Sequence, residues 1–293
     1  MQLNEHCRKN NMTITEALDK AYKKLRTNVE QPRLDAEVVL SSLLKKDRSY
    51  LTAHGTETLK TVKARQFEKL INRRSKNEPL AYILGYQPFY SQNFLVNKHT
   101  LIPRPETEQL IDEIKKHFRP TDKLTIIAVG TGCGNIALTL AKEFKNSAVF
   151  ALDISKRALK IAEKNKANLE IKNVKFLHSD LLSVLPNMKA DIIVANLPYL
   201  TKKDLKDSPT AKEISFEPSM AFLAKDEGLA LIKKIMKQGA TAMNPKGKMY
   251  LECDPSQSKK IKNWLKKEKL PYKFKVIKDF NKHDRVIILE LVK

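Results

Sequence analysis

Apolar residues follow two different patterns along this chain of 293 residues, and the change between them divides it. Near the amino terminus they recur at helical spacing, as in Ile14, Leu18, Tyr22 and Leu25. From about residue 104 onward, short continuous apolar runs alternate with helical patterns. We therefore predict a small helical part followed by a larger part built from alternating strands and helices.

The alternating part contains seven apolar runs that we predict to be strands, at 124–129, 148–152, 173–177, 191–195, 247–251, 274–277 and 286–291. Helical patterns lie between most of them, near 134–145, 156–168, 227–243 and 257–268. Crossover helices of this kind join parallel strands, so a mostly parallel sheet covered on both faces is expected. The last two runs have no helix-length connection, which predicts an antiparallel hairpin at one edge.

Proline, glycine and helix-capping residues mark the ends of predicted elements, and their positions suggest three segments. Residues 1–80 read as a helical bundle, since Thr13 to Glu16 have the form of a capping box and Pro32 suits the first turn of a helix. Residues 81–103 are rich in tyrosine and phenylalanine and predict a hairpin connector. Residues 104–293 form the predicted α/β domain.

A glycine-rich turn, Gly130-Thr131-Gly132-Cys133-Gly134, follows the first predicted strand of this domain. Glycines at such a strand-to-helix turn let the backbone pass close to a ligand. A dinucleotide fingerprint requires its third small residue at position 135, which is Asn here. The spacing argues against a nicotinamide site and favours a site for a methyl donor.

Two acidic residues end the next two predicted strands. Asp153 lies about 20 residues after the glycine turn, where a carboxylate grips ribose hydroxyls, and S-adenosylmethionine carries such hydroxyls. Asp180 and Leu181 follow the third strand and could offer adenine a polar group and an apolar wall. For Asp153 the alternative is a helix-capping carboxylate, and for Leu181 it is simple core packing.

The tetrapeptide Asn196-Leu197-Pro198-Tyr199 follows the fourth predicted strand. Ligands of open α/β sheets bind outside the carboxyl ends of the strands, so these residues would lie at the ligand edge. The Asn196 side chain offers a carbonyl oxygen, Pro198 stiffens the turn, and Tyr199 supplies a flat face. This arrangement is suited to holding one planar amino group beside a methyl donor.

Composition narrows the setting of this chemistry. No apolar stretch reaches the roughly 18 residues of a membrane span, and residues 1–6 lack the pattern of a secretory signal. The cysteines Cys7, Cys133 and Cys253 are scattered, so we expect a cytoplasmic protein with no disulfide and no bound metal. The net charge of +22 is compatible with proximity to RNA or the ribosome, but lysines spread over the whole chain also suit a merely soluble surface.

Taken in order, these segments resemble the release-factor glutamine methyltransferases over nearly the full length. The most specific segment is Leu101 to Glu108, read as LIPRPETE, and the segments Asp191 to Tyr199, Phe216 to Pro218 and His283 to Val286 also fit. The resemblance implies a Rossmann-like, seven-stranded class I methyltransferase domain with a helical amino-terminal domain for substrate recognition. It implies methyl transfer from S-adenosylmethionine to the amide N5 of the glutamine in the Gly-Gly-Gln motif of peptide chain release factors, by a monomer.

The resemblance also assigns roles to residues. It places the cofactor at Gly130 to Gly134, Asp153, Asp180, Leu181 and Asn196. Catalysis and substrate binding are assigned to the tetrapeptide that begins at Asn196, where the family usually has Asn-Pro-Pro-Tyr. The Asn196 side-chain oxygen and the Leu197 carbonyl would each accept one amide N–H, while Tyr199 and the Leu197 side chain would sandwich the planar amide.

Two positions depart from the family pattern. Leu197 replaces the first proline of the motif, but it keeps the main-chain carbonyl that the family uses, so function should survive with a less rigid turn. Ala128 stands where an acidic residue commonly precedes the glycine turn, which is expected to weaken the grip on the methionine end of the cofactor.

Two other functions fit part of the pattern. Asn-Leu-Pro-Tyr also resembles the motif of ribosomal RNA adenine dimethyltransferases, whose target amino group is equally planar and whose substrate would suit the positive charge. A non-catalytic protein that keeps the fold and binds a translation factor is the second alternative, because Ala128 leaves cofactor binding open.

Overall fold

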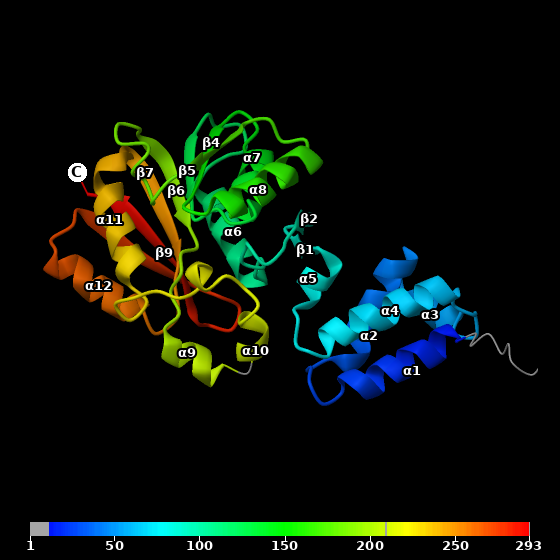
Figure 1. The fold of residues 1–293 in the computed structure, drawn as a ribbon. Helices are drawn as coiled ribbons and strands as arrows, with labels where there is room; N and C mark the ends of the chain where they lie inside the picture. Colours follow the sequence, from blue (N-terminus) through cyan, green and yellow to red (C-terminus); the bar gives the residue numbers. More distant parts are fainter. Residues whose placement is uncertain (1–11, 209, 293) are drawn as a thin grey trace, which may run out of the picture. The chain divides into compact units, whose positions relative to one another are not determined.

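The computed structural model describes residues 12–208 and 210–292 (Figure 1). Cys7 and the amino-terminal residues considered above lie outside the described residues. The chain divides into two compact units, Met1–Gly85 with Lys212–Phe216, and Tyr86–Ala211 with Glu217–Lys293. Each unit is described by itself below.

The first unit is the predicted helical bundle. Its first helix begins at the predicted capping box, in which the Glu16 N–H donates to Thr13 Oγ1 at 3.2 Å and the Thr13 N–H donates to Glu16 Oε2 at 2.8 Å. Buried Leu25, Val39 and Phe67 belong to its core. The helices are α1 (Ile14–Leu25), α2 (Pro32–Leu44), α3 (Arg48–Ala53), α4 (Thr61–Arg74) and α5 (Leu80–Leu84).

The boundary of this unit lies at Gly85, five residues beyond the predicted end of the bundle at residue 80. The short helix α5 causes the difference, because its Ile83 is buried in the core of the first unit. The predicted hairpin exists as β1 (Tyr86–Phe89) and β2 (Gln92–Leu95), and it belongs to the second unit. Asn165 of that unit holds it by accepting from the Leu95 N–H at 2.7 Å.

The second unit is built on a seven-stranded sheet of order β5-β4-β3-β6-β7-β9-β8. Neighbouring strands from β5 to β7 pair in parallel, whereas β9 is antiparallel to both β7 and β8, which confirms the predicted edge hairpin. The strands are β3 (Thr125–Val129), β4 (Ala148–Asp153), β5 (Val174–His178), β6 (Ala190–Ala195), β7 (Met243–Glu252), β8 (Tyr272–Lys278) and β9 (Asp284–Leu291).

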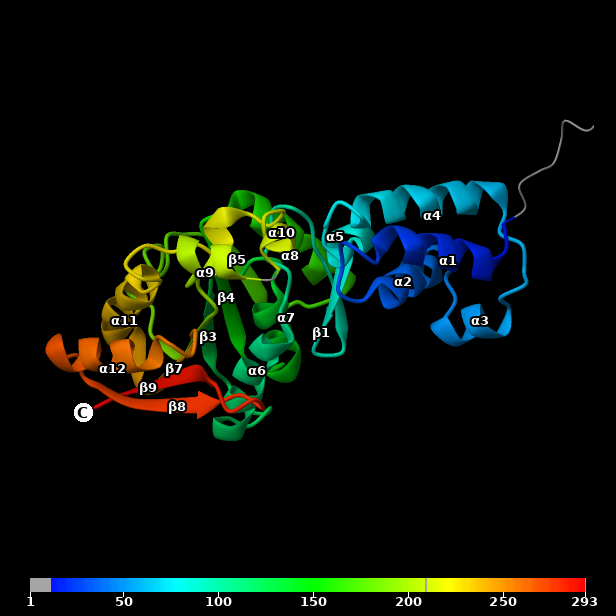
Figure 2. The same cartoon turned by 90° about the horizontal axis from the view of Figure 1, so that it is seen from below.

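Helices cover both faces of this sheet (Figures 1 and 2). On one face α11 (Ala230–Ala242) and α12 (Ser258–Lys267) pack their apolar residues against the strands. On the other lie α6 (Glu108–His117), α7 (Asn135–Glu143) and α8 (Lys156–Asn168). The parallel strands therefore present their carboxyl ends at one edge, where the glycine turn, Asp153 and Asn196 are brought together.

The segment between β6 and α11 holds elements that periodicity does not predict. It contains α9 (Lys202–Asp207), α10 (Ala211–Ile214) and the 3₁₀ turn η2 (Ser219–Ala221), and a second such turn, η1 (Pro105–Thr107), precedes α6. Within the described residues, no helix combines the length and apolarity that a membrane crossing requires. Nor do three or more His, Cys, Asp or Glu side chains among them gather as metal ligands.

Candidate active site

The glycines of the predicted turn adopt backbone conformations that other residues rarely adopt. The φ angles of Gly130, Gly132 and Gly134 are 67°, 56° and 90°. A Cβ on Gly134 would lie 3.0 Å from Leu138 Cδ1 and 3.2 Å from the Cβ of Ala162. The turn therefore requires glycine both for its conformation and for the close packing of α7 on α8.

Asp153 closes β4 and fixes the same turn. Its Oδ2 accepts from the Gly132 N–H and its Oδ1 from the Ser155 N–H, each at 2.8 Å. Burial raises the pKa of the Asp153 carboxyl, and these two donors act in the opposite direction. Each carboxylate oxygen keeps a further acceptor position, so Asp153 can order the turn and still accept from ribose hydroxyls.

The loop after β5 supplies an apolar wall. Leu181 is buried and has a φ of 50°, a left-handed conformation that the Ser179 hydroxyl supports by donating to the Leu181 carbonyl at 2.7 Å. The neighbouring Asp180 is half-exposed and forms an ion pair with Lys234 at 2.5 Å. Asp180 therefore has a protein partner, and its predicted contact with adenine stays a prediction.

A cavity of about 960 Å³, including its open mouth, lies at this edge of the sheet. A Cβ on Gly132 would meet no atom within 4 Å, so the turn faces open space there. The predicted site residues that line the cavity are Gly130, Gly132, Asp153, Asp180, Leu181, Asn196, Leu197 and Pro198.

These features fit S-adenosylmethionine. The open face of Gly132 lets the backbone approach a ligand, and Asp153 and Leu181 line the same cavity. Their expected contacts with ribose hydroxyls and adenine stay predictions. Thr131 and Cys133 are not among the lining residues and are buried within the turn. Burial raises the pKa of the Cys133 thiol to about 12, which keeps it protonated at neutral pH.

Asn196 follows the last residue of β6 and faces the cavity with its side chain tethered on one side. Its Nδ2 donates to Thr107 Oγ1 at 3.0 Å. Its Oδ1 has no hydrogen-bond donor among residues 12–208 and 210–292. The predicted acceptor oxygen is therefore available for a ligand, and the amide nitrogen is the end that the protein holds.

Leu197 and Tyr199, the two residues of the expected sandwich, both contact other parts of the protein. The Leu197 side chain is buried, and its Cδ2 lies so close beneath the glycine turn that a Cβ on Gly130 would be 3.1 Å away. Tyr199 packs against the core, and its hydroxyl donates to Glu252 Oε1 at 3.1 Å. Leu197 thus shapes the cavity floor, and the stacking role of Tyr199 stays a prediction.

Sequence models of two known domains match this chain. Residues 16–85 match a model described as the PrmC N-terminal domain, and residues 120–280 match a methyltransferase domain model. A release factor glutamine methyltransferase of Buchnera aphidicola is 34% identical over 282 residues, covering 94% of this chain and 99% of that protein. Another of Coxiella burnetii is 38% identical over 250 residues, covering 85% and 89%.

This chain belongs to the release factor glutamine methyltransferase family. Among solved structures, a ribosomal protein L11 methylase of Lactobacillus delbrueckii subsp. bulgaricus is similar with a TM-score of 0.48 and 21% identity, covering 71% of this chain and 90% of that one. Against the family pattern, the departure at Ala128 lies within β3, where the residue is buried and pairs with Ala151 and Val194. The departure at Leu197 leaves its carbonyl without a donor among the described residues.

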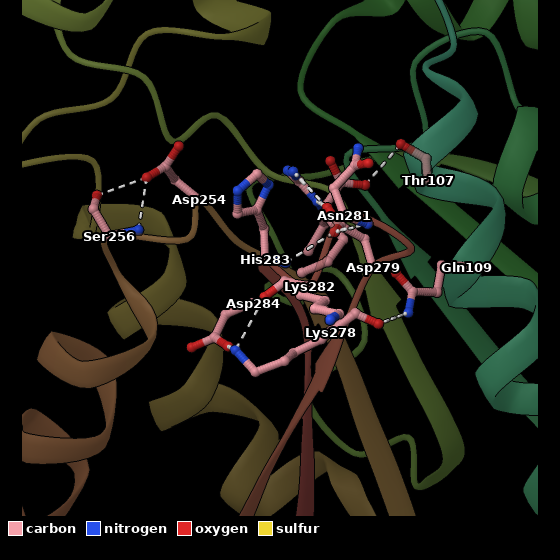
Figure 3. A network of polar contacts seen from close by, with 12 residues as sticks. Thr107, Gln109, Asp254, Ser256, Lys278, Asp279, Asn281, Lys282, His283 and Asp284 are labelled. Atoms are coloured by element: carbon pink, nitrogen blue, oxygen red, sulfur yellow. Dashed lines mark hydrogen bonds and ion pairs between the residues drawn. The ribbon is translucent and has the colours of Figure 1, made fainter.

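Sequence reasoning missed two buried polar residues behind Asn196. Thr107 ends η1, and its hydroxyl donates to Glu252 Oε2 at 2.7 Å (Figure 3). Glu252 is the last residue of β7, so the rule that drew attention to Asp153 at the end of its strand would also have found it. Arg104, which the sequence suggested would fix the connector, pairs with the buried Glu217. Glu217 accepts from the Arg104 guanidinium and from the Ile102 N–H, which fixes the connector.

Proposed function

We propose that this protein transfers a methyl group from S-adenosylmethionine to the side-chain amide nitrogen of the glutamine in the Gly-Gly-Gln motif of peptide chain release factors. The observation that carries the proposal is the Asn196 side chain, which is held through its nitrogen and presents a free acceptor oxygen to the cavity. Membership of the family supports the choice of a glutamine amide as acceptor.

The chemical difficulty lies in the nucleophile. An amide nitrogen is weakly nucleophilic because its lone pair is delocalised into the carbonyl group. Bound S-adenosylmethionine would supply an electrophilic methyl group: the bond from sulfur to the methyl carbon would break as the nitrogen–carbon bond forms, and a neutral thioether would leave. The methylated nitrogen would then release one of its two protons to water. The protein must therefore orient the nitrogen and stabilise the positive charge that develops on it.

The two acceptors of the motif meet this need. Asn196 Oδ1 and the Leu197 carbonyl lack donors among the described residues, so each can accept one N–H of the substrate amide. Acceptors that are fixed in advance stabilise developing positive charge without reorganising during the reaction. With both N–H groups held, the lone pair of the amide nitrogen is directed at the methyl group. Positioning of the two reactants contributes most of the remaining acceleration.

Asn196→Ala tests this function in the intact protein. Loss of a fixed electrostatic partner should lower kcat by about 10²–10³-fold, while binding of S-adenosylmethionine in calorimetry changes little. Transfer of labelled methyl should be measured in parallel to release factor and to ribosomal RNA. Label on RNA alone would favour an adenine methyltransferase, and absence of any binding of S-adenosylmethionine would favour a non-catalytic protein.

A further inference from the structure

Four side chains form a continuous chain of hydrogen bonds behind the motif. Asn196 Nδ2 donates to the Thr107 hydroxyl at 3.0 Å, and this hydroxyl donates to Glu252 Oε2 at 2.7 Å. The other carboxylate oxygen, Oε1, accepts from the Tyr199 hydroxyl at 3.1 Å. One buried carboxylate thus connects the first and the last residue of the tetrapeptide.

The chemistry of the carboxylate sets the direction of every bond in this chain. An ionised carboxylate can only accept, so the single proton of the Thr107 hydroxyl must point at Glu252. The Thr107 oxygen is then left as an acceptor, and only the NH₂ end of the Asn196 amide can satisfy it. The Asn196 oxygen must consequently face the cavity.

Glu252 accepts a hydrogen bond at each carboxylate oxygen, from the Thr107 hydroxyl and from the Tyr199 hydroxyl, which is the bonding of an ionised carboxylate. Its side chain is almost fully buried, and this burial raises the pKa of the Glu252 carboxyl, whereas the bond from Thr107 and the positive charge of Arg285 act in the opposite direction. Arg285 is itself held by Asp279, whose Oδ2 accepts from its guanidinium at 3.1 and 3.3 Å. Asp279 lies in the turn between β8 and β9, beside Lys278 and His283 (Figure 3).

We propose that Thr107 and Glu252 are positioning residues that fix the orientation of the Asn196 amide, so that its oxygen and not its NH₂ group meets the substrate nitrogen. The inference rests on the proposed function. A flipped Asn196 would present two N–H donors to a nitrogen that also carries N–H groups. Without the relay, a fraction of the protein would therefore hold an amide that repels the substrate instead of accepting from it.

Thr107→Val and Thr107→Ser test the relay as a pair. Valine keeps the shape of threonine without its hydroxyl, and serine keeps the hydroxyl without the methyl group. We expect Thr107→Val to lower kcat on the order of 10²-fold, in line with the loss of one oriented polar group at a reacting centre, with KM for S-adenosylmethionine unchanged. Thr107→Ser should restore most of the lost kcat, which a purely packing role of the side chain would not predict.

Glu252→Gln tests whether the carboxylate of Glu252 sets the direction of these hydrogen bonds. It also keeps the inference testable if the Thr107→Val variant does not fold. A glutamine amide can donate to Thr107 as well as accept from it, so kcat should again fall with little change in KM for S-adenosylmethionine. Glu113→Gln is the matched control, because Glu113 is also a buried carboxylate but pairs with Lys116 on α6, outside the relay. It should retain the kcat of the wild type.

Two results would overturn the inference. One is wild-type kcat in both Thr107→Val and Glu252→Gln while the wild-type protein methylates release factor. The other is a loss in Thr107→Val that Thr107→Ser does not restore. If the wild-type protein itself transfers no methyl group to release factor, the proposed function fails first, and this outcome is distinct from either.

Discussion

Gly228→Ala is the substitution with the most specific consequence for the motif, although Gly228 is not part of it. The φ of Gly228 is 83°, and an added Cβ would lie 2.0 Å from the Tyr199 carbonyl oxygen and 2.3 Å from Gln257 Nε2. Contacts below 3.0 Å are essentially never found for real Cβ atoms, so the Tyr199 carbonyl would have to move by about 1 Å. That carbonyl accepts from Gln257 Nε2 at 3.1 Å, a bond that the shift would break.

The magnitude follows from these two effects. A non-glycine residue in the left-handed region costs roughly 1–2 kcal/mol, and a lost hydrogen bond costs about 0.5–1.5 kcal/mol. We therefore expect Gly228→Ala to lower the free energy of unfolding by about 1.5–3.5 kcal/mol. Because Tyr199 moves with its carbonyl, kcat should also fall about 10²-fold, as for a 1 Å misplacement of a reacting group.

Gly85→Ala separates the cost of backbone strain from the cost of a steric clash. Gly85 has a φ of 84°, but a Cβ there would meet no atom within 4 Å, so this variant should lose only the roughly 1–2 kcal/mol of backbone strain and keep its kcat. Urea denaturation followed by circular dichroism gives the stabilities, and methyl transfer to release factor gives kcat. Equal stability losses in the two variants, with unchanged kcat in Gly228→Ala, would refute the reasoning.

Three further predictions concern other parts of the protein. Burial raises the pKa of the Cys133 and Cys253 thiols to about 12, so at pH 8 both should resist alkylation in the native protein and react after unfolding in urea, as peptide mapping will show. Asp153→Asn should weaken binding of S-adenosylmethionine in calorimetry by about 1.5–3 kcal/mol, or roughly 10- to 150-fold, unless the carboxylate serves only the turn. Arg74→Met removes the buried partner of Asp35 (2.6 Å) and Glu213 (2.7 Å), and should cost about 3–5 kcal/mol of stability in urea denaturation; a loss below about 1 kcal/mol would contradict the assigned pairing.

The regular elements could be predicted because their patterns are local. A parallel strand buried on both faces is a continuous apolar run, and the run at 191–195 became β6 at Ala190–Ala195. The helices α9 and α10 bury no residue, so their sequences contain no apolar stripe from which a helix could be predicted. The helix α5 joins the first unit because Ile83 is buried in the core of that unit, and the spacing of apolar residues does not encode this tertiary contact.

The residues of the candidate site also fall into two groups, those that the sequence predicts and those that only the tertiary fold reveals. Asp153 and Asn196 were found because each follows or ends a strand, and the fold brings such positions to one edge. Thr107 was missed because its partner Glu252 is 145 residues away, and only the tertiary fold brings them together. The partner of Asp180, Lys234, is likewise a matter of tertiary packing between a loop and α11.

The most direct test is mass spectrometry of the Gly-Gly-Gln peptide of a release factor after incubation with this protein and S-adenosylmethionine. The account predicts a gain of one methyl group on the glutamine side chain with the wild-type protein, and the same gain at a rate about 10²–10³-fold lower with Asn196→Ala. The account would be contradicted if the glutamine stayed unmodified with folded protein that binds S-adenosylmethionine. A methyl group on another residue of the peptide would also contradict it.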